Sequence, residues 1–334
     1  MRIAVDAMGG DYAPRTVVAG VVEAARLHRG AVEVWLVGRE DAIAAELVRL
    51  GVTAEGLGIR IVAASEVVGM DEAPGQAIRR KRDSSLRRAA DLMAKGEVDG
   101  VVSAGNTGAV VGIMHVVVGS LAGVDRPAVA ALMPNLKGRS MLLDVGATVD
   151  CKPDQLYQFA VMGHTYIKEI FGIAEPSVGL LSIGEEASKG NELTKEAYKL
   201  LKSSSLRFIG NVEGRDIYLG KADVIVCDGF VGNLVLKSGE SMVEALDTVV
   251  RDEYRRSLLL RLGVMLAYWP LTQLRKRWDY TEVGGAPLLG LNGTCIICHG
   301  RSDAKSIRNA IGVARDFVAA RINQRIEEKL RDVA

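Results

Sequence analysis

The sequence predicts an α/β protein in which helices cover both faces of a largely parallel sheet. Short apolar runs alternate with helical segments along the chain, and polar, glycine-rich loops follow several of these runs. The chain has 37 Gly against 3 Trp, 8 Tyr and 5 Phe, which favours an α/β enzyme with glycine-rich loops over an aromatic-rich sandwich or barrel. In such a fold, ligands bind at the carboxyl ends of the strands.

The predicted strands and helices begin at the N-terminus. Residues Arg2–Asp6 form a strand, and residues 14–28 form a helix with Pro14 near its start. Residues 108–124 are apolar but contain four glycines and His115, so they predict a buried helix rather than a membrane span. Further predicted strands cover residues 32–37, 59–63, 100–103, 128–132, 141–145, 177–182, 208–210 and 224–227.

Length and charge narrow the class of protein. The 334 residues suit one large α/β domain over residues 1–334, although this length would also fit two structural units. Lys and Arg number 42 against 41 Asp and Glu, and 49% of the residues are hydrophobic, which disfavours a disordered chain and a globally basic nucleic-acid binder. The N-terminal run reaches Asp6 and Gly9 too early for a signal peptide, so we expect a cytoplasmic protein.

The four cysteines, Cys151, Cys227, Cys295 and Cys298, are too few for a disulfide scaffold in a chain of this length. The last two, with His299, match the pattern of covalent haem attachment, and Cys-x-x-Cys alone can bind zinc. The chain lacks an export signal and a second ligand pair at zinc spacing, so a buried strand is the favoured interpretation. We expect neither a metal nor a cofactor.

Glycines and small polar residues recur in the loops that follow the predicted strands. Glycines let a ligand approach the backbone, and the amides at the start of a following helix attract an anion. Because parallel strands end at one edge of a sheet, these loops predict one shared pocket. The loops cover residues 6–11, 103–109, 144–150, 182–191 and 227–233.

The sequence does not contain the standard signatures of nucleotide, zinc-protease or serine-hydrolase sites, which are GxGxxG, GxxxxGK[ST], HExxH and GxSxG. The residue types of the loops suit phosphate instead, because cations and amides bind anions and carboxylates orient them. The candidate cations are Lys189, Arg79, Arg301 and Lys305, the candidate amides are Asn106, Asn191 and Asn233, and the candidate acids are Asp144, Glu185 and Asp228.

As an ordered set, blocks of the sequence resemble the phosphate acyltransferase family called PlsX. The blocks are DAMGGD (6–11), QAIRRKRDSS (76–85), SAGNTGA (103–109), LLDVGATVDC (142–151), IGEEASKGNE (183–192), VCDGFVGNLVLK (226–237) and LLGLNGT with the following HG (288–300). The resemblance covers essentially the whole chain. It implies a three-layer α/β/α sandwich similar to isopropylmalate dehydrogenase and phosphotransacetylase, which works as a homodimer.

The resemblance also implies an activity, the transfer of a long-chain acyl group from acyl carrier protein to inorganic phosphate. The acyl phosphate produced would enter phospholipid synthesis, with a membrane-bound glycerol-3-phosphate acyltransferase as a partner. Phosphate is already a nucleophile near neutral pH, so the protein has to hold it, align it with the thioester carbonyl and stabilise the oxyanion.

Four residues are the candidate catalytic groups. Lys189 would contact phosphate or the oxyanion, Asn106 and Asn233 would complete the cradle, and His299 would protonate the departing thiolate. The alternatives are a surface lysine and a hydrogen-bonded structural histidine. The candidate substrate-binding residues are Asp6, Gly9, Gly10, Asp11, Arg79, Ser84, Ser103, Thr107, Gly108, Asp144, Glu185, Asp228 and Gly229.

Residues 79–88 form a basic segment with six basic residues and one acid. Such a patch attracts acidic partners, which makes acyl carrier protein the expected one. Aromatic stacking residues are missing nearby, which disfavours nucleic acid as a partner. A solvated helix face is the alternative interpretation.

Residues 251–279 interrupt the α/β pattern with apolar residues, two tryptophans, and seven Arg or Lys against three acids. This composition predicts an amphipathic helical insertion, bent at Pro270, that lies on a membrane surface. We therefore expect peripheral membrane association. A helical hairpin at a dimer interface is the alternative, and both can hold for different faces.

Two other functions remain open from the sequence. One is a short-chain phosphate acyltransferase that uses coenzyme A, which acyl-chain preference would distinguish. The other is a non-enzymatic scaffold that binds acyl carrier protein and membranes, which predicts no phosphate-dependent loss of thioester.

Overall fold

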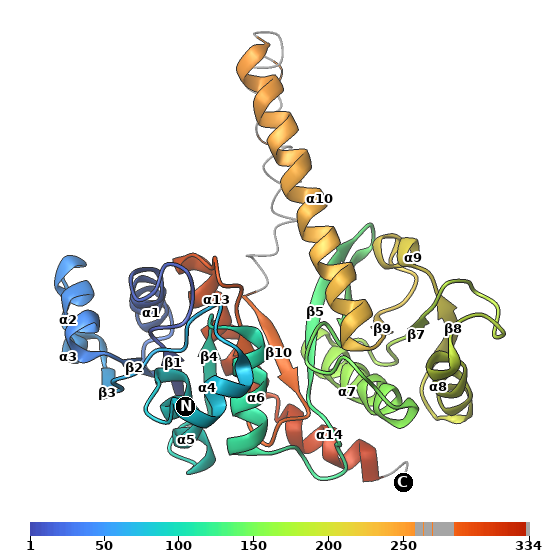
Figure 1. Cartoon of the computed structure of the whole chain (residues 1–334), viewed down its shortest axis with the longest axis horizontal. Coiled ribbons are helices and arrows are strands. Elements are labelled where there is room, and N and C mark those ends of the chain that lie inside the picture. The colour runs from blue at the N-terminus through green and yellow to red at the C-terminus, as the bar shows by residue number, and fades with distance from the viewer. Residues whose placement is uncertain (258–262, 264–268, 270–283, 332–334) are drawn as a thin grey trace.

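A computed structural model describes residues 1–257, 263, 269 and 284–331. Across these residues the strands form one sheet in the order β3-β2-β1-β4-β11-β10-β5-β6-β9-β7-β8 (Figure 1). Strand β10 is antiparallel to both neighbours and β5 is antiparallel to β6, whereas the other described pairs are parallel. The strands are β1 (Arg2–Asp6), β2 (Glu33–Gly38), β3 (Ile59–Ala63), β4 (Gly100–Ser103), β5 (Ala128–Asn135), β6 (Gly138–Leu143), β7 (Val178–Leu181), β8 (Phe208–Val212), β9 (Val224–Val226), β10 (Ala286–Leu289) and β11 (Cys295–Ile297).

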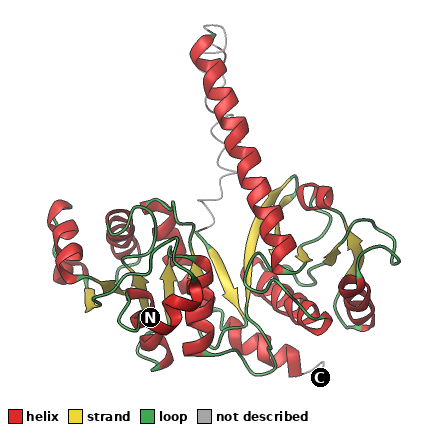
Figure 2. Ribbon diagram, in the orientation of Figure 1, coloured by secondary structure: helices red, strands yellow, loops and turns green. Residues whose placement is uncertain are grey.

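Helices cover both faces of this sheet, as the sequence predicted (Figure 2). One face carries α4, α5, α6, α9 and α10, and the other carries α1, α2, α7, α8, α13 and α14, each packed through apolar side chains. The architecture is therefore a three-layer α/β/α sandwich. The described helices are α1 (Arg15–Leu27), α2 (Glu40–Arg49), α3 (Ala54–Leu57), α4 (Pro74–Arg80), α5 (Ser85–Ala94), α6 (Thr107–Val118), α7 (Pro153–Phe171), α8 (Glu192–Ser203), α9 (Gly214–Leu219), α10 (Gly229–Arg256), α13 (Ala304–Ala319) and α14 (Ile322–Arg331).

Polar residues at the ends of loops determine where several helices begin. A side-chain oxygen of each of these residues accepts a hydrogen bond from a backbone N–H in the first turn, which satisfies an amide that lacks a helical partner. The residues are Ser84 before α5, Asn106 before α6, Asn191 before α8, Asp228 before α10 and Asp303 before α13. Some of the loop residues expected to bind substrate are therefore helix caps.

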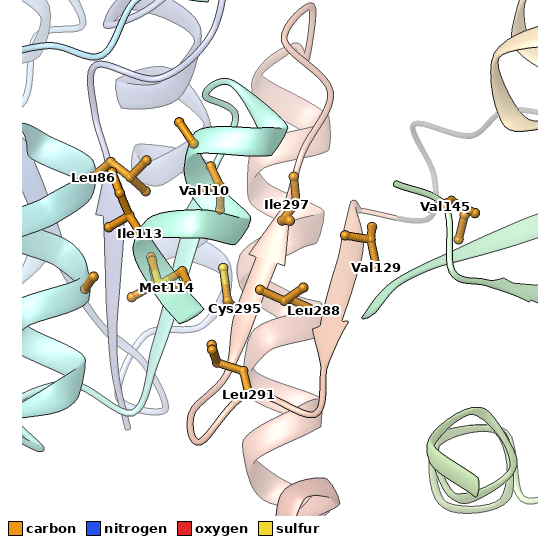
Figure 3. Close-up of a cluster of buried hydrophobic side chains, with 14 of the residues drawn as sticks. Leu86, Val110, Ile113, Met114, Val129, Val145, Leu288, Leu291, Cys295 and Ile297 are labelled. Carbon is orange, nitrogen blue, oxygen red and sulfur yellow. The ribbon is translucent and has the colours of Figure 1, made fainter. Parts of the chain in front are cut away.

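Strand β11 shows how side-chain alternation divides the core. Cys295 and Ile297 face the layer that contains α6, where Cys295 lies beside Met114 (Figure 3). Ile296 and Cys298 face the opposite layer, which contains α13. Both cysteines are buried, which confirms the predicted buried strand. Because their side chains point to opposite faces, the two cysteines do not converge on one ligand.

The structure differs from the predicted secondary structure in two places. The helix expected over residues 108–124 is α6, which ends at Val118 because Gly119 follows with a positive φ of 83°. Strand β10 was not predicted; it has four residues, and one of them is Pro287, a residue type that is uncommon in central strands.

The predicted insertion over residues 251–279 is described only in part. Residues 251–256 form the end of α10, and most of the remainder lies outside the described residues. None of the helices that the structure describes combines the length and the apolar character needed to cross a membrane.

Candidate active site

A cleft of about 370 Å³ lies where the carboxyl ends of β4 and β11 approach β5 and α10. Four of the predicted site residues line it: Thr107, Gly108, Asn233 and His299. The complete lining is Thr107, Gly108, Val129, Ala131, Leu132, Val145, Gly146, Asn233, Leu236, Lys237, Glu240, Gly285, Ala286, Ile297, Cys298, His299, Ser302 and Ser306. Both polar and apolar side chains line it.

Two helix N-termini contribute to the polar part of the cleft. Thr107 and Gly108 are the first two residues of α6, and Ser302 and Ser306 flank the start of α13. Backbone amides at a helix N-terminus lack helical partners and carry the positive end of the helix dipole. The start of α6 therefore favours an anion in the cleft, whereas the carboxylate of Asp303 already occupies the start of α13.

Lys237 supplies a cation at the same place. It lies four residues after Asn233, so the two side chains share one face of α10. The Lys237 Nζ donates to Glu240 Oε2 at 2.8 Å and lies 3.4 Å from His299 Nε2. Since Lys237 and Glu240 both line the cleft, this ion pair holds the ammonium group beside the imidazole.

The hydrogen bonds of His299 indicate which ring nitrogen carries its proton. Its Nδ1 accepts the backbone N–H of Arg301 at 3.1 Å, which places the proton of the neutral ring on Nε2. The Nε2–H of His299 and the ammonium group of Lys237 are thus two donors 3.4 Å apart. A phosphate oxygen is an acceptor that both can share.

The loop after β1 packs against the loop after β4, which lines the cleft. Asp6 is buried, and its Oδ2 accepts from Ser103 Oγ at 2.7 Å, which ties the ends of the adjacent strands β1 and β4. Burial raises the pKa of Asp6. A Cβ on Gly9 would lie 2.7 Å from the amide nitrogen of Gly105, so only glycine permits this approach.

The same loop also contacts the loop after β11. The N–H of Asp11 donates to the carbonyl of Gly300 at 2.8 Å, and Gly10 packs against that carbonyl too. The loops after β1, β4 and β11 therefore converge, and the first two belong to the five loops that were predicted to share a pocket. Asp6, Gly9, Gly10, Asp11 and Ser103 do not line the cleft, and their contacts position the loops that do.

Asn106 has a different position from the one expected for an oxyanion donor. Its Oδ1 accepts the N–H of Ala109, and its Nδ2 donates to the carbonyls of Met70 at 2.7 Å and Glu72 at 3.2 Å. Both amide hydrogens are therefore directed to backbone carbonyls. The structure assigns Asn106 to capping α6 and holding the segment before α4 against it.

Asp144 and Gly229 are also structural in position. Asp144 is fully buried and accepts from the backbone N–H groups of Val129, Ala147 and Thr148. Burial nevertheless raises its pKa to about 6. A Cβ on Gly229 would lie 2.6 Å from Asp144 Oδ2, so this contact packs the start of α10 against the loop after β6.

Five further predicted site residues lie outside the cleft. Lys189 is exposed in the loop after β7, a strand that β6 and β9 separate from β5. In the same loop, Glu185 pairs with Lys221 at 2.7 Å. Arg79 is exposed and donates to the carbonyl of Gly75. The remaining two, Ser84 and Asp228, cap α5 and α10.

Two further residues, Arg301 and Asp303, have partners near the cleft. Arg301 approaches Glu244 of α10 at 3.8 Å, and Asp303 caps α13 by accepting the N–H of Ser306 at 2.8 Å. Within the described part of the chain, no group of three or more His, Cys, Asp or Glu residues is placed to hold a metal ion.

Comparisons with known proteins identify the family. A family model described as "Fatty acid synthesis protein" matches residues 1–325. The phosphate acyltransferase of Heliobacterium modesticaldum is 52% identical over 339 aligned residues, which cover 100% of both chains. The phosphate acyltransferase of Pelotomaculum thermopropionicum is 50% identical over 100% of this chain and 96% of its own. The chain belongs to this family of phosphate acyltransferases.

Solved structures with a similar fold are more distant. A phosphotransacetylase from Streptococcus pyogenes superposes with a TM-score of 0.62 at 19% identity, covering 96% of this chain and 94% of its own. A branched-chain phosphotransacylase from Enterococcus faecalis V583 gives 0.58 at 14% identity, covering 95% and 99%. At these identities the likeness concerns the fold, and family membership makes the chain an acyltransferase.

An acyltransferase has to accommodate an apolar acyl group, and one wall of the cleft is apolar. Its side chains come from β5, β10, β11, α10 and the loop after β6. They are Val129, Ala131, Leu132, Val145, Leu236, Ala286 and Ile297. This wall and Lys237 were not predicted from the sequence, because they lie in strands and within a helix rather than in the loops after strands. The four-residue spacing of Asn233 and Lys237 places both on one helix face, which is the signal that could have identified the lysine.

Proposed function

We propose that this phosphate acyltransferase transfers an acyl group from a thioester to inorganic phosphate and releases acyl phosphate. One observation carries the proposal: a single cleft combines an apolar wall with Lys237, His299 and the N-terminus of α6. Phosphate and an acyl chain need these two environments side by side. The names of the relatives support the same reaction.

The reaction begins with phosphate held in the polar part of the cleft. Amides at the start of α6 and the ammonium group of Lys237 bind its oxygens. One phosphate oxygen attacks the thioester carbonyl carbon, whose oxygen gains the negative charge of the tetrahedral intermediate. The same donors stabilise that charge. The carbon–sulfur bond then breaks, which leaves acyl phosphate and a thiolate.

His299 is the proposed hydrogen-bond donor to the leaving group. Its Nε2 carries the ring proton, because Nδ1 accepts from the backbone of Arg301. This Nε2–H stabilises the thiolate as the carbon–sulfur bond breaks, but a neutral imidazole is too weak an acid to give the proton up. The attacking hydrogen phosphate loses its own proton as it becomes acyl phosphate, and that proton converts the thiolate to a neutral thiol.

The proposed acyl donor is acyl carrier protein, which is acidic. Arg79, Arg80 and Arg82 form no ion pair among the described residues, whereas Lys81, Arg87 and Arg88 pair with acids. The free positive charge is thus smaller than the sequence count. The start of α4 lies beside the cleft, because a Cβ on Gly108 would be 2.8 Å from Pro74 Cγ. A carrier docked on α4 would therefore place its thioester near the cleft.

Purified protein, phosphate and palmitoyl acyl carrier protein test this function. We expect acyl phosphate and free thiol to form together, at a rate that depends on the phosphate concentration. Faster reaction of acetyl or butyryl coenzyme A would instead support a short-chain enzyme. Carrier binding without phosphate-dependent thiol release would support a scaffold and contradict the proposal.

We also propose that the protein is a homodimer joined through α10. Its second half projects from the sheet layers (Figure 1) and exposes an apolar stripe. Met242 is 63% exposed, Leu246 is 58% exposed and Val249 is 60% exposed. Helices with such a stripe need a covering surface.

Residues 251–279 remain our proposed membrane contact. At the membrane, acyl phosphate would reach a membrane-bound glycerol-3-phosphate acyltransferase in phospholipid synthesis.

A further inference from the structure

The sheet opens between β10 and β5 at the position of the cleft. The two strands pair at Ala128 and Val129, and they diverge beyond that point (Figure 1). Residues from both helical layers line the opening, with Thr107 of α6 from one layer and Ser306 of α13 from the other. The cleft therefore extends between the strands from one face of the sheet toward the other.

Leu132 lies at the edge of this opening. Val129 and Ala131 face the layer of α6 and α10, whereas Leu132 belongs to the opposite side, which α7 covers. Leu132 nevertheless lines the cleft, and it also lines a second cavity of about 500 Å³. This one side chain thus borders both spaces.

The second cavity has an apolar part beside its polar residues. Ile167, Phe171, Ile173 and Ala222 line it together with Leu132. Phe171 is 42% exposed and Ile173 is 37% exposed, although both are large apolar side chains. An apolar ligand would cover them.

Three of the polar residues in the wall of this cavity have partners within the protein, and the other two, Lys137 and Arg139, are exposed and can remain in contact with water. Asn135 Nδ2 donates to Ser140 Oγ at 2.8 Å, and Ser140 Oγ donates to the carbonyl of Ala222 at 2.6 Å. Asp223 Oδ2 accepts from Ser177 Oγ at 2.6 Å. A hydrocarbon could therefore fill the cavity without leaving these groups unsatisfied.

We propose that the distal part of a long acyl chain occupies this second cavity and reaches it by passing beside Leu132. The proposal rests on the proposed function, and it deepens that function by naming a site for the chain. A methylene takes about as much space as a water molecule, roughly 30 Å³, so the cavity has room for ten or more carbons. It thus supports a long-chain substrate.

Binding of a fluorescent sixteen-carbon fatty acid tests the site without turnover. Ile173→Trp fills the cavity, Leu132→Trp fills the passage, and Val48→Trp on exposed α2 is the matched control. Each buried methylene strengthens binding about fourfold, so we expect both cavity variants to weaken binding at least tenfold. The control should bind as the unsubstituted protein does. Circular dichroism and thermal unfolding establish that each variant is folded.

Turnover gives a second readout. We expect Ile173→Trp to lower the ratio of palmitoyl to butyryl transfer at least tenfold, because only the longer chain reaches the second cavity. Equal binding of the probe by Ile173→Trp and Val48→Trp, or no binding by the unsubstituted protein, would overturn the proposal. Probe binding that responds as expected in a protein without phosphate-dependent transfer would overturn the proposed function and leave the chain site standing.

Discussion

At the scale of single residues, two lysines mark two alternative positions of the active site. Lys237 lines the cleft beside His299, whereas Lys189 is exposed in a loop outside it. Loss of a donor that stabilises developing charge lowers turnover on the order of 100- to 1,000-fold. We therefore expect Lys237→Ala to reduce kcat for acyl-phosphate formation by this factor, as measured by release of free thiol.

Lys189→Ala is the matched control, because it removes the same charge from the same chain at a position outside the cleft. Its kcat should stay close to that of the unsubstituted protein. A large loss of kcat for Lys189→Ala, together with normal turnover for Lys237→Ala, would indicate that the active site lies at the loop after β7.

Asp144 links the stability of the fold to pH. Its pKa is raised to about 6 by burial, although the amides of Ala147 and Thr148 donate to it. In the unfolded chain the carboxyl ionises near pH 4, so between about pH 4 and 6 the folded state binds the additional proton. The contribution of Asp144 to stability is therefore greatest below pH 4, and it falls as pH rises to about 6.

Asp144→Asn removes this titration while keeping the size of the side chain. We expect the unfolding free energy of the unsubstituted protein, relative to the variant, to fall by up to about 3 kcal/mol between pH 4 and 6 and then to level off. Urea unfolding at a series of pH values measures this difference. The contributions of the other carboxyls are the same in both proteins and therefore cancel. A difference that stays constant over that range would show that Asp144 does not titrate there.

At the scale of elements, one side chain connects the start of α6 with the segment before α4. Asn106 caps this helix and also donates to the carbonyls of Met70 and Glu72. Asn106→Ala removes both functions, and loss of an N-cap costs about 1 kcal/mol. We expect a lower melting temperature and faster amide hydrogen exchange in the segment before α4.

Asn106→Asp separates the two functions, since its carboxylate can still accept the N–H of Ala109 but cannot donate. It should restore the melting temperature of the alanine variant in part and leave the faster exchange near Met70 unchanged. Slow exchange there in both variants would mean that the two carbonyl contacts do not hold this segment.

Elements also explain which parts of the site were predictable from the sequence. Thr107 and His299 follow β4 and β11, which are adjacent and parallel, so a rule about strand ends placed them correctly in one cleft. Lys189 follows β7, and its distance from β5 depends on a strand order that no local pattern reveals. Lys237 lies within α10, where that rule does not apply. Polar loop residues such as Asn106 were ambiguous, because capping and ligand binding favour the same side chains.

At the scale of the whole molecule, the projecting half of α10 predicts self-association. Met242, Leu246 and Val249 recur at helical spacing and remain exposed on one stripe. A second copy of the same stripe is a self-complementary cover, because a two-fold axis places like patches face to face. We expect light scattering to give the mass of a dimer for the unsubstituted protein.

The double substitution Leu246→Glu and Val249→Glu tests this interface. It would bury four uncompensated carboxylates in a dimer, whose desolvation the contact could not offset, so we expect the mass of a monomer. Val48→Glu, on an exposed position of α2, adds the same charge elsewhere and should remain dimeric. A double variant that stays dimeric would show that the interface is on another surface. If the unsubstituted protein is a monomer, the stripe would instead be a membrane contact, and binding to anionic vesicles would detect this.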